Sequence, residues 1–265
     1  MSTPSILRKI VETKQIELSE RRAKRSASEL RARIEDQDPP RDFHAALKNR
    51  ADVRNAAVIA EFKRASPSAG WIRQHADPAE VARAYEAGGA ACMSVLTDAE
   101  YFRGSDDDLT AARTACSLPV IRKDFIIDDW QVLETRALGA DALLLIVAAL
   151  DDSRLEGLST LGRELGLSVL VEVHDQDELE RALAIPGHLL GINNRDLHRF
   201  ETRLETSLEL APQVPPERVV VAESGIHKPD DIQRLRDAGI HAYLIGEALM
   251  KHGTPEATLR ELIDL

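Results

Sequence analysis

The sequence predicts a single (β/α)8 TIM barrel with an N-terminal helical extension. Two patterns lead to this fold class: apolar runs alternate with amphipathic segments from residue 56 onward, and residues 1–55 stand outside that alternation. The length of 265 residues agrees, because one α/β barrel routinely has this length. With 43% hydrophobic and 30% charged residues, the chain can bury a large core.

Eight short apolar runs are the predicted strands. They are nearly continuous and rich in β-branched residues, as expected for parallel strands that are covered on both faces. The runs are AAVIAEF (56–62), ACMSVLT (91–97), LPVIRKD (118–124), ALLLIV (142–147), SVLVEV (168–173), LLGINN (189–194), RVVVAES (218–224) and AYLIG (242–246).

Most segments between these runs have the pattern of amphipathic helices. Three of them begin near Asp or Pro and end at Gly, which are helix start and stop signals. Residues 198–215 hold only a short helix. Eight strand–helix units without a break favour closure into a barrel, and a doubly wound open sheet is the alternative.

The first 55 residues contain three further helical patterns. Residues 5–23 read as an amphipathic helix with Ile6, Ile10 and Ile16 among its apolar positions, and helices are also expected over residues 26–34 and from 39–47. These residues are too few and too polar for a core of their own. We therefore expect one domain overall, in which residues 1–55 pack on the barrel of residues 56–265.

Composition argues against several classes of partner. The net charge of −11 disfavours nucleic acid, which needs a basic surface. No apolar run approaches the length of a membrane span, and the N-terminus lacks the apolar core of a signal peptide. Cys92 and Cys116 lie in apolar runs without metal-type spacing, so we expect reduced core thiols in a cytoplasmic protein.

Polar residues gather at the ends of the predicted strands, where barrel enzymes place their chemistry. Alternation along a strand puts Glu61 and Lys63 on one face and Phe62 on the other. The same parity directs Lys123 and Glu172 inward, and inward residues of alternate strands share a layer. Two lysines and a carboxylate are therefore expected in one pocket. The alternative is that these charges are solvated, or that Glu61 only pairs with Lys63.

Two glycine-containing loops indicate a phosphate site. SGI (224–226) and IGEALM (245–250) follow the last two strands, where phosphates commonly dock in barrels. Ser66 in the first loop adds a hydroxyl. A few local dipoles and cations suffice to bind a small anion to an acidic protein.

Other polar residues carry no recognised motif. The histidines lack metal-type spacing, and His174, His198 and His227 are interpreted as surface or loop residues. Asp106, Asp107 and Asp108 are interpreted as a solvated helix start rather than a metal site. Neither GxGxxG nor a P-loop motif occurs, so no dinucleotide or nucleoside triphosphate is indicated.

Seven motifs at successive strand ends together resemble one family. In chain order they are IAEFKRASPSAG, VLTDAEYFRGS, VIRKDFIID, LVEVHD, GINNRDL, AESGI and IGEALM. They closely resemble the indole-3-glycerol-phosphate synthases of tryptophan biosynthesis, and the likeness extends to PRDFHAAL before the barrel.

The resemblance implies a reaction and a set of catalytic residues. In this reaction 1-(2-carboxyphenylamino)-1-deoxyribulose 5-phosphate closes to indole-3-glycerol phosphate with loss of CO2 and water, and neither a metal nor an organic cofactor is implied. Lys123 resembles the general acid, Lys63 and Glu172 match the second acid and the base, Glu61 holds the lysines charged, and Asn193 positions the substrate. Which lysine acts at which step stays open, since either ammonium can donate.

The resemblance also implies binding residues. The phosphate and substrate positions are Ser66, Arg195, Ser224, Gly225, Gly246 and Glu247. Some members carry a small polar residue in place of Glu247, so we expect only its backbone N–H to contribute. Phe102 and Phe125 either flank the anthranilate ring or belong to the core.

Two other functions compete with this interpretation. Phosphoribosylanthranilate isomerase uses a cysteine at the end of the first strand, where this chain has Glu61 and Lys63. A catalytically silent barrel would lack one of the charged strand-end residues, and none is missing. As partners we expect a small phosphorylated substrate and no nucleic acid or membrane, with the chain a monomer or weak homo-oligomer and association with other tryptophan-pathway enzymes left open.

Overall fold

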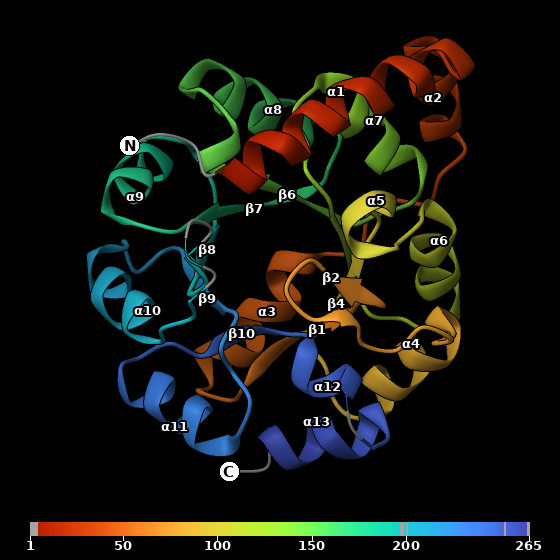
Figure 1. Cartoon of the computed structure of the whole chain (residues 1–265). Coiled ribbons are helices and arrows are strands. Elements are labelled where there is room, and N and C mark those ends of the chain that lie inside the picture. The colour runs from red at the N-terminus through yellow and green to blue at the C-terminus, as the bar shows by residue number, and fades with distance from the viewer. Residues whose placement is uncertain (1–4, 197–198, 200, 252, 264–265) are drawn as a thin grey trace.

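The computed structural model describes residues 5–196, 199, 201–251 and 253–263, and it confirms the (β/α)8 barrel. Eight parallel strands close in the order β1-β10-β9-β8-β7-β6-β5-β4, with the helices arranged in a ring around them (Figure 1). The barrel strands are β1 (Ala57–Phe62), β4 (Cys92–Leu96), β5 (Val120–Lys123), β6 (Ala142–Ile146), β7 (Ser168–Val173), β8 (Leu189–Asn193), β9 (Val219–Glu223) and β10 (Ala242–Ile245).

The helices outside the barrel begin where the sequence signals predict. Asp77 caps α4 by accepting backbone N–H groups, with Pro78 in the first turn, and Asp128 caps α7 in the same way. The helices that follow the strands are α4 (Pro78–Ala87), α6 (Asp106–Ala115), α7 (Asp129–Ala137), α8 (Asp152–Glu164), α9 (Gln176–Leu183), α10 (Glu205–Leu210), α11 (Pro229–Asp237) and α13 (Pro255–Ile263).

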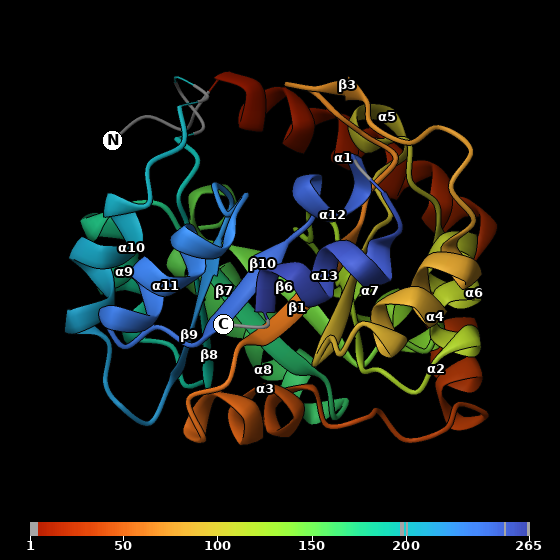
Figure 2. The ribbon, with the colours of Figure 1, turned by 90° about the horizontal axis from the view of Figure 1, so that it is seen from below.

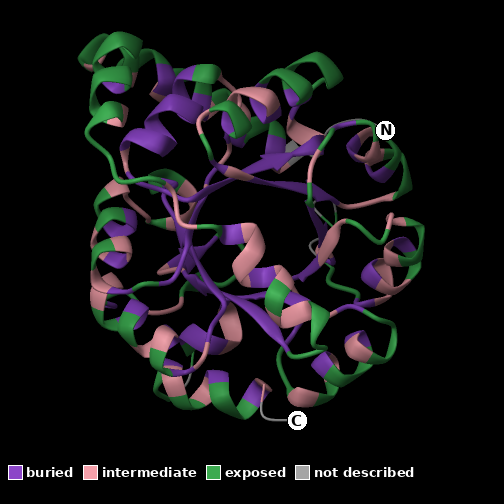
Figure 3. Ribbon diagram, turned by 180° about the vertical axis from the view of Figure 1, so that it is seen from behind, coloured by how far each residue is buried: buried purple, intermediate pink, exposed green. Residues whose placement is uncertain are grey.

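Alternation along each strand divides the core into two layers. Ile59 and Ile121 pack inside the barrel, whereas Val58, Phe62 and Met93 pack between the strands and the helices. The strands are buried and the outward faces of the helices are exposed (Figure 3). The predicted parity is thus confirmed, and every second residue of a strand points toward the barrel axis.

Three helices precede the barrel, α1 (Ser5–Lys24), α2 (Ala27–Glu35) and α3 (Phe43–Asp52). The first and third cover opposite ends: α1 lies across the end that carries β3 (Gly70–Trp71) and α5 (Ala99–Phe102), and α3 lies at the other end (Figure 2). Phe43 and Leu47 of α3 are buried among the interior residues of the barrel and so close its lower end. Leu18 of α1 and Leu30 of α2 pack with Trp130 of α7.

The buried face of α1 differs from the expected one. Of the apolar positions in the helical pattern, Ile10 is buried, whereas Ile16 is 64% exposed and lies outside the packed face. The buried stripe is Leu7, Ile10, Lys14 and Leu18, a helical spacing that contains a lysine instead of an isoleucine. Hydropathy could not predict the burial of Lys14, because a buried lysine is stabilised by ion pairs that hydropathy does not describe.

Short elements lie between the main strands and helices. They are β2 (Ala65–Ser66), β3 (Gly70–Trp71), α5 (Ala99–Phe102), the 3-10 helices η1 (Val147–Ala149) and η2 (Ala211–Gln213), and α12 (Glu247–Lys251). His198, for which a loop position was expected, lies outside the described residues. Within the described part of the chain, no helix combines the length and apolarity needed to cross a membrane.

Candidate active site

A pocket with a cavity volume of about 170 Å³ lies at the carboxyl ends of the barrel strands. Every site residue suggested by the sequence lines it. They are Glu61, Lys63, Ser66, Phe102, Lys123, Phe125, Glu172, Asn193, Arg195, Ser224, Gly225, Gly246 and Glu247. Residues of α1, among them Leu7 and Ile10, complete the pocket, so the N-terminal extension forms part of its wall.

Lys123, at the end of β5, is held between two carboxylates. Its Nζ lies 2.7 Å from Glu172 Oε2 and 3.0 Å from Glu223 Oε2. Burial disfavours the charged amine, but Glu172, Glu223 and Glu61 outweigh burial and raise the pKa of Lys123. Lys123 is therefore an ammonium at neutral pH. We call Lys123, Glu172 and Glu223 the pocket cluster.

Glu223 is the member of the pocket cluster that the sequence reasoning missed. It ends β9, two residues after Val221, which packs in the barrel interior. The parity that located Lys123 and Glu172 also directs Glu223 inward, so the signal was present in the sequence. Glu61, Lys123, Glu172 and Glu223 thus come from four alternate strands, which form one layer in such barrels.

The two carboxylates of the pocket cluster differ in environment. Burial of Glu223 and repulsion from Glu172 outweigh the attraction of Lys123 and raise the pKa of Glu223 to about 8. Burial also disfavours the Glu172 carboxylate, but Lys123 and His174 outweigh it, so the pKa of Glu172 lies well below its usual range. Glu223 Oε1 is buried without a hydrogen-bond partner among the described residues.

Lys63 enters the same pocket but contacts a different acid. Its Nζ lies 2.7 Å from Glu61 Oε1, and no ion pair joins it to Glu172 in the described part of the chain. The side chain of Lys63 is 16% exposed, compared with 5% for Glu61. The pair places a second ammonium at the rim, where it remains accessible to a ligand.

Two glycines leave room for the buried carboxylates. A Cβ at residue 191 would collide with Glu223 Oε1, and a Cβ at residue 246 would collide with Glu61 Oε1. Because Gly191 and Gly246 have no side chain, they leave the space that the carboxylates of Glu223 and Glu61 occupy.

Asn193 and Arg195 link the pocket cluster to the rim. Asn193 Nδ2 donates to Glu172 Oε1 at 3.1 Å, and Asn193 Oδ1 accepts the backbone N–H of Arg195. Arg195 Nη1 donates to Ser68 Oγ at 2.8 Å, while its Nη2 lies 3.8 Å from Glu247 Oε2. A guanidinium is thus held at the pocket mouth between the first and last loops.

The three loops expected to bind phosphate meet at the pocket. Ser224 and Gly225 have positive φ angles of 65° and 79°, which turn the chain sharply after β9. Ser66 of β2 accepts the backbone N–H of Ala69, so its loop is folded back on itself. Glu247 forms an ion pair with Lys251, and this contact lowers the pKa of Glu247.

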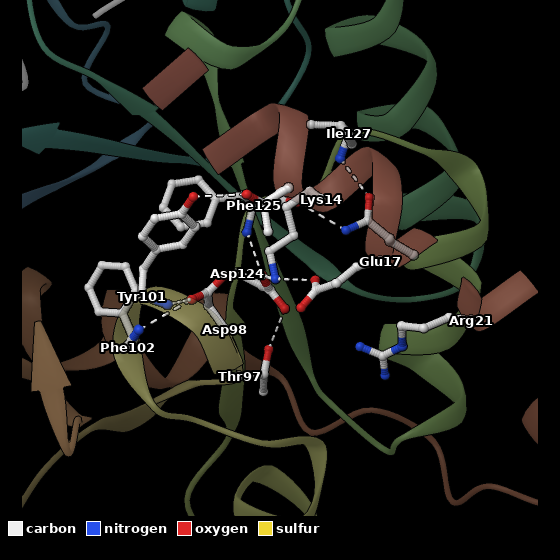
Figure 4. A network of polar contacts seen from close by, with 12 residues as sticks. Lys14, Glu17, Arg21, Thr97, Asp98, Tyr101, Phe102, Asp124, Phe125 and Ile127 are labelled. Atoms are coloured by element: carbon white, nitrogen blue, oxygen red, sulfur yellow. Dashed lines mark hydrogen bonds and ion pairs between the residues drawn. The ribbon is translucent and has the colours of Figure 1, made fainter. Parts of the chain in front are cut away.

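A buried ion network supports the aromatic wall of the pocket (Figure 4). Lys14 Nζ lies 2.8 Å from Asp98 Oδ2 and 3.0 Å from Asp124 Oδ1, and the lysine is only 2% exposed. Asp98 also caps α5, whose last residue is Phe102, and Asp124 directly precedes Phe125. The two rings lie 6.1 Å apart in the pocket wall.

The same network continues through Arg122, a fully buried residue of β5 that faces the helices. Its Nη1 lies 3.0 Å from Glu134 Oε2, and its Nη2 lies 3.3 Å from Asp124 Oδ2. Burial opposes the charge of Arg122, but the surrounding acids outweigh it and raise its pKa. We call Lys14, Asp98, Arg122, Asp124 and Glu134 the wall network.

The acidic run at residues 106–108 is a helix start, as predicted, but it is not simply solvated. Asp106 contacts Arg122 at 3.2 Å, and Asp108 is 5% exposed and bound by Arg64. The solvated interpretation holds only for Asp107, which is exposed. Among the described residues, no group of three or more His, Cys, Asp or Glu side chains is placed to hold a metal ion.

His174 is a loop residue, one of the two positions expected for it, but it does not lie on the surface. Its side chain is 9% exposed, its Nε2 lies 3.3 Å from Glu172 Oε1, and its Nδ1 lies 3.0 Å from Glu178 Oε2. Position within VEVHD could not show this burial, because it depends on how the following helix, which carries Glu178, packs beside the ring. His227, by contrast, is an exposed loop residue, as expected.

Comparisons with known proteins bear on the fold and the family of this chain. In overall fold the chain is similar to the solved structure of N-acetylmannosamine-6-phosphate 2-epimerase from Clostridium perfringens, with a TM-score of 0.59 and 15% identity over 76% of this chain and 90% of that chain. A model of the indole-3-glycerol phosphate synthase family matches residues 7–262. The family match includes all eight barrel strands and every site residue that the sequence predicted. The chain therefore belongs to the indole-3-glycerol phosphate synthase family.

Proposed function

We propose that the pocket cluster drives the ring closure, with Lys123 as the proton donor. The chain is a carboxy-lyase of tryptophan biosynthesis that forms indole-3-glycerol phosphate. The observation that carries the assignment of Lys123 is its place in the pocket between Glu172 and Glu223, which keeps it an ammonium. An ammonium in a water-poor pocket is suited to neutralise a developing oxyanion.

The reaction requires two proton donors and one base. The ring carbon that bears the carboxylate attacks the C2′ carbonyl carbon, and Lys123 donates a proton to the oxygen. CO2 then leaves, and its electron pair stays in the ring system. The new hydroxyl departs as water with a proton from Lys63, while Glu172 accepts the proton released as the indole double bond forms. Asn193 fixes Glu172 for this step, and Glu61 holds Lys63.

The substrate is proposed to bind with its two ends at opposite sides of the pocket cluster. The phosphate lies at the loops of Ser224, Gly225 and Gly246, with the hydroxyl of Ser66 nearby. The anthranilate ring lies against Phe102 and Phe125 under α1, an apolar surface that suits a flat ring.

A fluorescence assay for indole-3-glycerol phosphate tests the proposal. The purified full chain is treated with EDTA and mixed with the carboxyphenylamino substrate, and product is expected without added metal. The same assay on Lys123→Ala, Lys63→Ala and Glu172→Gln tests the three roles separately. Failure of the wild-type chain to form product would contradict the function, and full turnover by any one variant would contradict that residue's role.

We propose a cytoplasmic location and a monomer or weak homo-oligomer. The location is supported by Cys92 and Cys116, which are the chain's two cysteines and are both buried and unpaired. Reduced thiols of this kind suit a reducing compartment.

A further inference from the structure

The two carboxylates of the pocket cluster have unequal sets of partners. Lys123 contacts both at similar distances, 2.7 Å to Glu172 and 3.0 Å to Glu223. Glu172 has two further neighbours, Asn193 and His174, whereas Glu223 Oε1 has no hydrogen-bond partner in the described part of the chain. Lys123 alone therefore does not decide which carboxylate stays ionised.

His174 lies at the turn between β7 and α9, with one carboxylate at each ring nitrogen. Nε2 is 3.3 Å from Glu172 Oε1 and Nδ1 is 3.0 Å from Glu178 Oε2. The backbone N–H of His174 also donates to Glu178 Oε2, at 2.8 Å. Glu178, in the first turn of α9, therefore fixes both the backbone and the ring of His174.

Two carboxylates beside one imidazole favour a proton on each ring nitrogen, because the charged ring attracts both acids. Nδ1 is hydrogen-bonded to Glu178, whereas Nε2 lies at ion-pair distance from Glu172 without hydrogen-bond geometry, so Glu172 is affected by the charge of the ring. Burial disfavours the charged ring, but Glu172 and Glu178 outweigh it and raise the pKa of His174 to about 10.

We propose that His174 is a positioning residue that selects Glu172, rather than Glu223, as the base of the reaction. This inference rests on the proposed role of Glu172 as the proton acceptor. The imidazolium adds a second cation beside Glu172, and Glu223 has only the shared Lys123. Two like charges at one ammonium cannot both ionise readily, so the extra cation makes Glu172 the ionised member and Glu223 the protonated one.

The charges around His174 come from every side of the turn. Glu172 faces it from β7 and Glu178 from α9, and beyond Glu172 lie Lys123 of β5 and Glu223 of β9. Glu178 is partly accessible, with a side chain 16% exposed. Its carboxylate supports the charge of His174 from outside the pocket.

The pH profile of kcat for His174→Gln tests the proposal. Glutamine keeps an amide near Glu172 but removes the cation, so Glu172 should take up its proton at higher pH. The acid limb of the profile should move upward by about one pH unit or more. At pH values on the acid limb itself, turnover should fall about tenfold for each pH unit that the limb moves. Turnover at pH 9 should approach that of the wild type, and KM should change less than kcat.

Glu178→Gln is the second variant. Because the side chain of Glu178 is partly exposed, this substitution should disturb folding of the chain less than a change at the buried His174. It should move the acid limb in the same direction by a smaller amount, since His174 then keeps one carboxylate. Glu180→Gln, on the exposed face of the same helix, and His75→Gln, in an exposed loop, are matched controls that should leave the profile in place.

Direct titration of His174 supplies a readout that is independent of turnover. Imidazole NMR signals of the full chain should show His174 still protonated at pH 8, and a neutral ring at pH 7 would overturn the proposal. An acid limb unmoved in His174→Gln, or an equal loss of kcat at every pH, would also overturn it. If Glu172→Gln kept full turnover, the role of Glu172 would fail instead; if Glu172→Gln lost turnover while His174→Gln left the limb in place, only the inference would fail.

Discussion

The pocket cluster and the wall network are two sets of buried charges that share strand β5. Lys123 points into the barrel, whereas its neighbours Arg122 and Asp124 belong to the wall network. Both sets are nearly sealed from water: Arg122 is 1% exposed, Glu223 1% and Glu172 3%. One strand thus supports two charge networks through the alternation of its side chains.

The two sets differ in how completely their charges are paired. Both carboxylate oxygens of Asp124 have partners, one with Lys14 and one with Arg122, and Glu134 is paired with Arg122 and Arg21. Among the described residues, Glu223 Oε1 of the pocket cluster has neither a hydrogen bond nor an ion pair, whereas Asp98 Oδ2 of the wall network lacks a hydrogen bond but lies 2.8 Å from Lys14 Nζ. A fully paired buried network can serve the fold alone, whereas one that lacks a partner is available to a ligand.

The largest expected effect belongs to Lys123→Ala. Loss of the acid catalyst should lower kcat by roughly 10²-fold or more, and the fold should survive because Glu172 and Glu223 can share a proton. Steady-state kinetics measures the first expectation and circular dichroism the second. The control is Lys48→Ala on α3, at the far end of the barrel, with a side chain that is 44% exposed. Turnover near the wild-type value would make Lys63 the better candidate for the acid.

Arg122→Met should lower the stability of the fold much more than it lowers kcat, the reverse of Lys123→Ala. Removing one partner of a buried ion pair costs about 3–5 kcal/mol of stability, since the remaining acids lose their counter-charge. Urea unfolding measures the loss, and the folded fraction should retain much more of its kcat than Lys123→Ala. The matched control is Arg83→Met, an exposed arginine of α4, for which the expected change is within about 0.5 kcal/mol. A stable Arg122→Met variant with no turnover would contradict the view that the wall network serves the fold and the pocket cluster serves catalysis.

Lys14→Met tests whether the wall network affects substrate binding, because Lys14 lies where the wall network meets the pocket. Without the ammonium, α1 loses its link to Asp98 and Asp124, and the surface beneath Phe102 and Phe125 loosens. We expect KM to rise by roughly 3- to 10-fold, since loss of about 1 kcal/mol of binding changes an equilibrium about fivefold, with a smaller change in kcat. The control is Lys9→Met, an exposed lysine of the same helix. An unchanged KM would contradict the placement of α1 over bound substrate.

The smallest effect is expected for Glu247→Gln at the rim. Its carboxylate is 22% exposed and already paired with Lys251, and such pairs contribute about 0–1 kcal/mol. KM should therefore change by less than roughly fivefold. A much lower KM would mean that the carboxylate repels the phosphate in the wild-type chain. A much higher one would mean that the side chain binds substrate.

Strand periodicity explains how much of the site the sequence predicts. Parity placed Glu61, Lys123 and Glu172 in one pocket because a period of two needs only local sequence. The same rule directs Glu223 inward, although the serine and glycine that follow it carry the more conspicuous phosphate motif. The inward position of Glu223 was therefore predictable from strand parity alone, and no physical effect hides it in the sequence.

Other residues could not be placed from sequence for a physical reason. Lys14 is 84 residues from Asp98 and 110 from Asp124, and Asp108 meets Arg64 across two strand–helix units. No periodic pattern encodes such contacts, because they depend on how a helix lies across loops. Hydropathy also favoured Ile16 over Lys14 for the packed face of α1, since it does not register a buried charge whose partners come from elsewhere.

By itself the sequence determined the barrel, the direction of its strand-end charges and the family, since all three follow from local periodicity and short motifs in order. Tertiary structure alone decided which charges pair. It placed Lys123 between Glu172 and Glu223, buried His174 against Glu172, and anchored α1 through Lys14. The reason is that a charge acquires its pKa and its role from neighbours within a few ångströms, and those neighbours come from strands and helices distant in the chain.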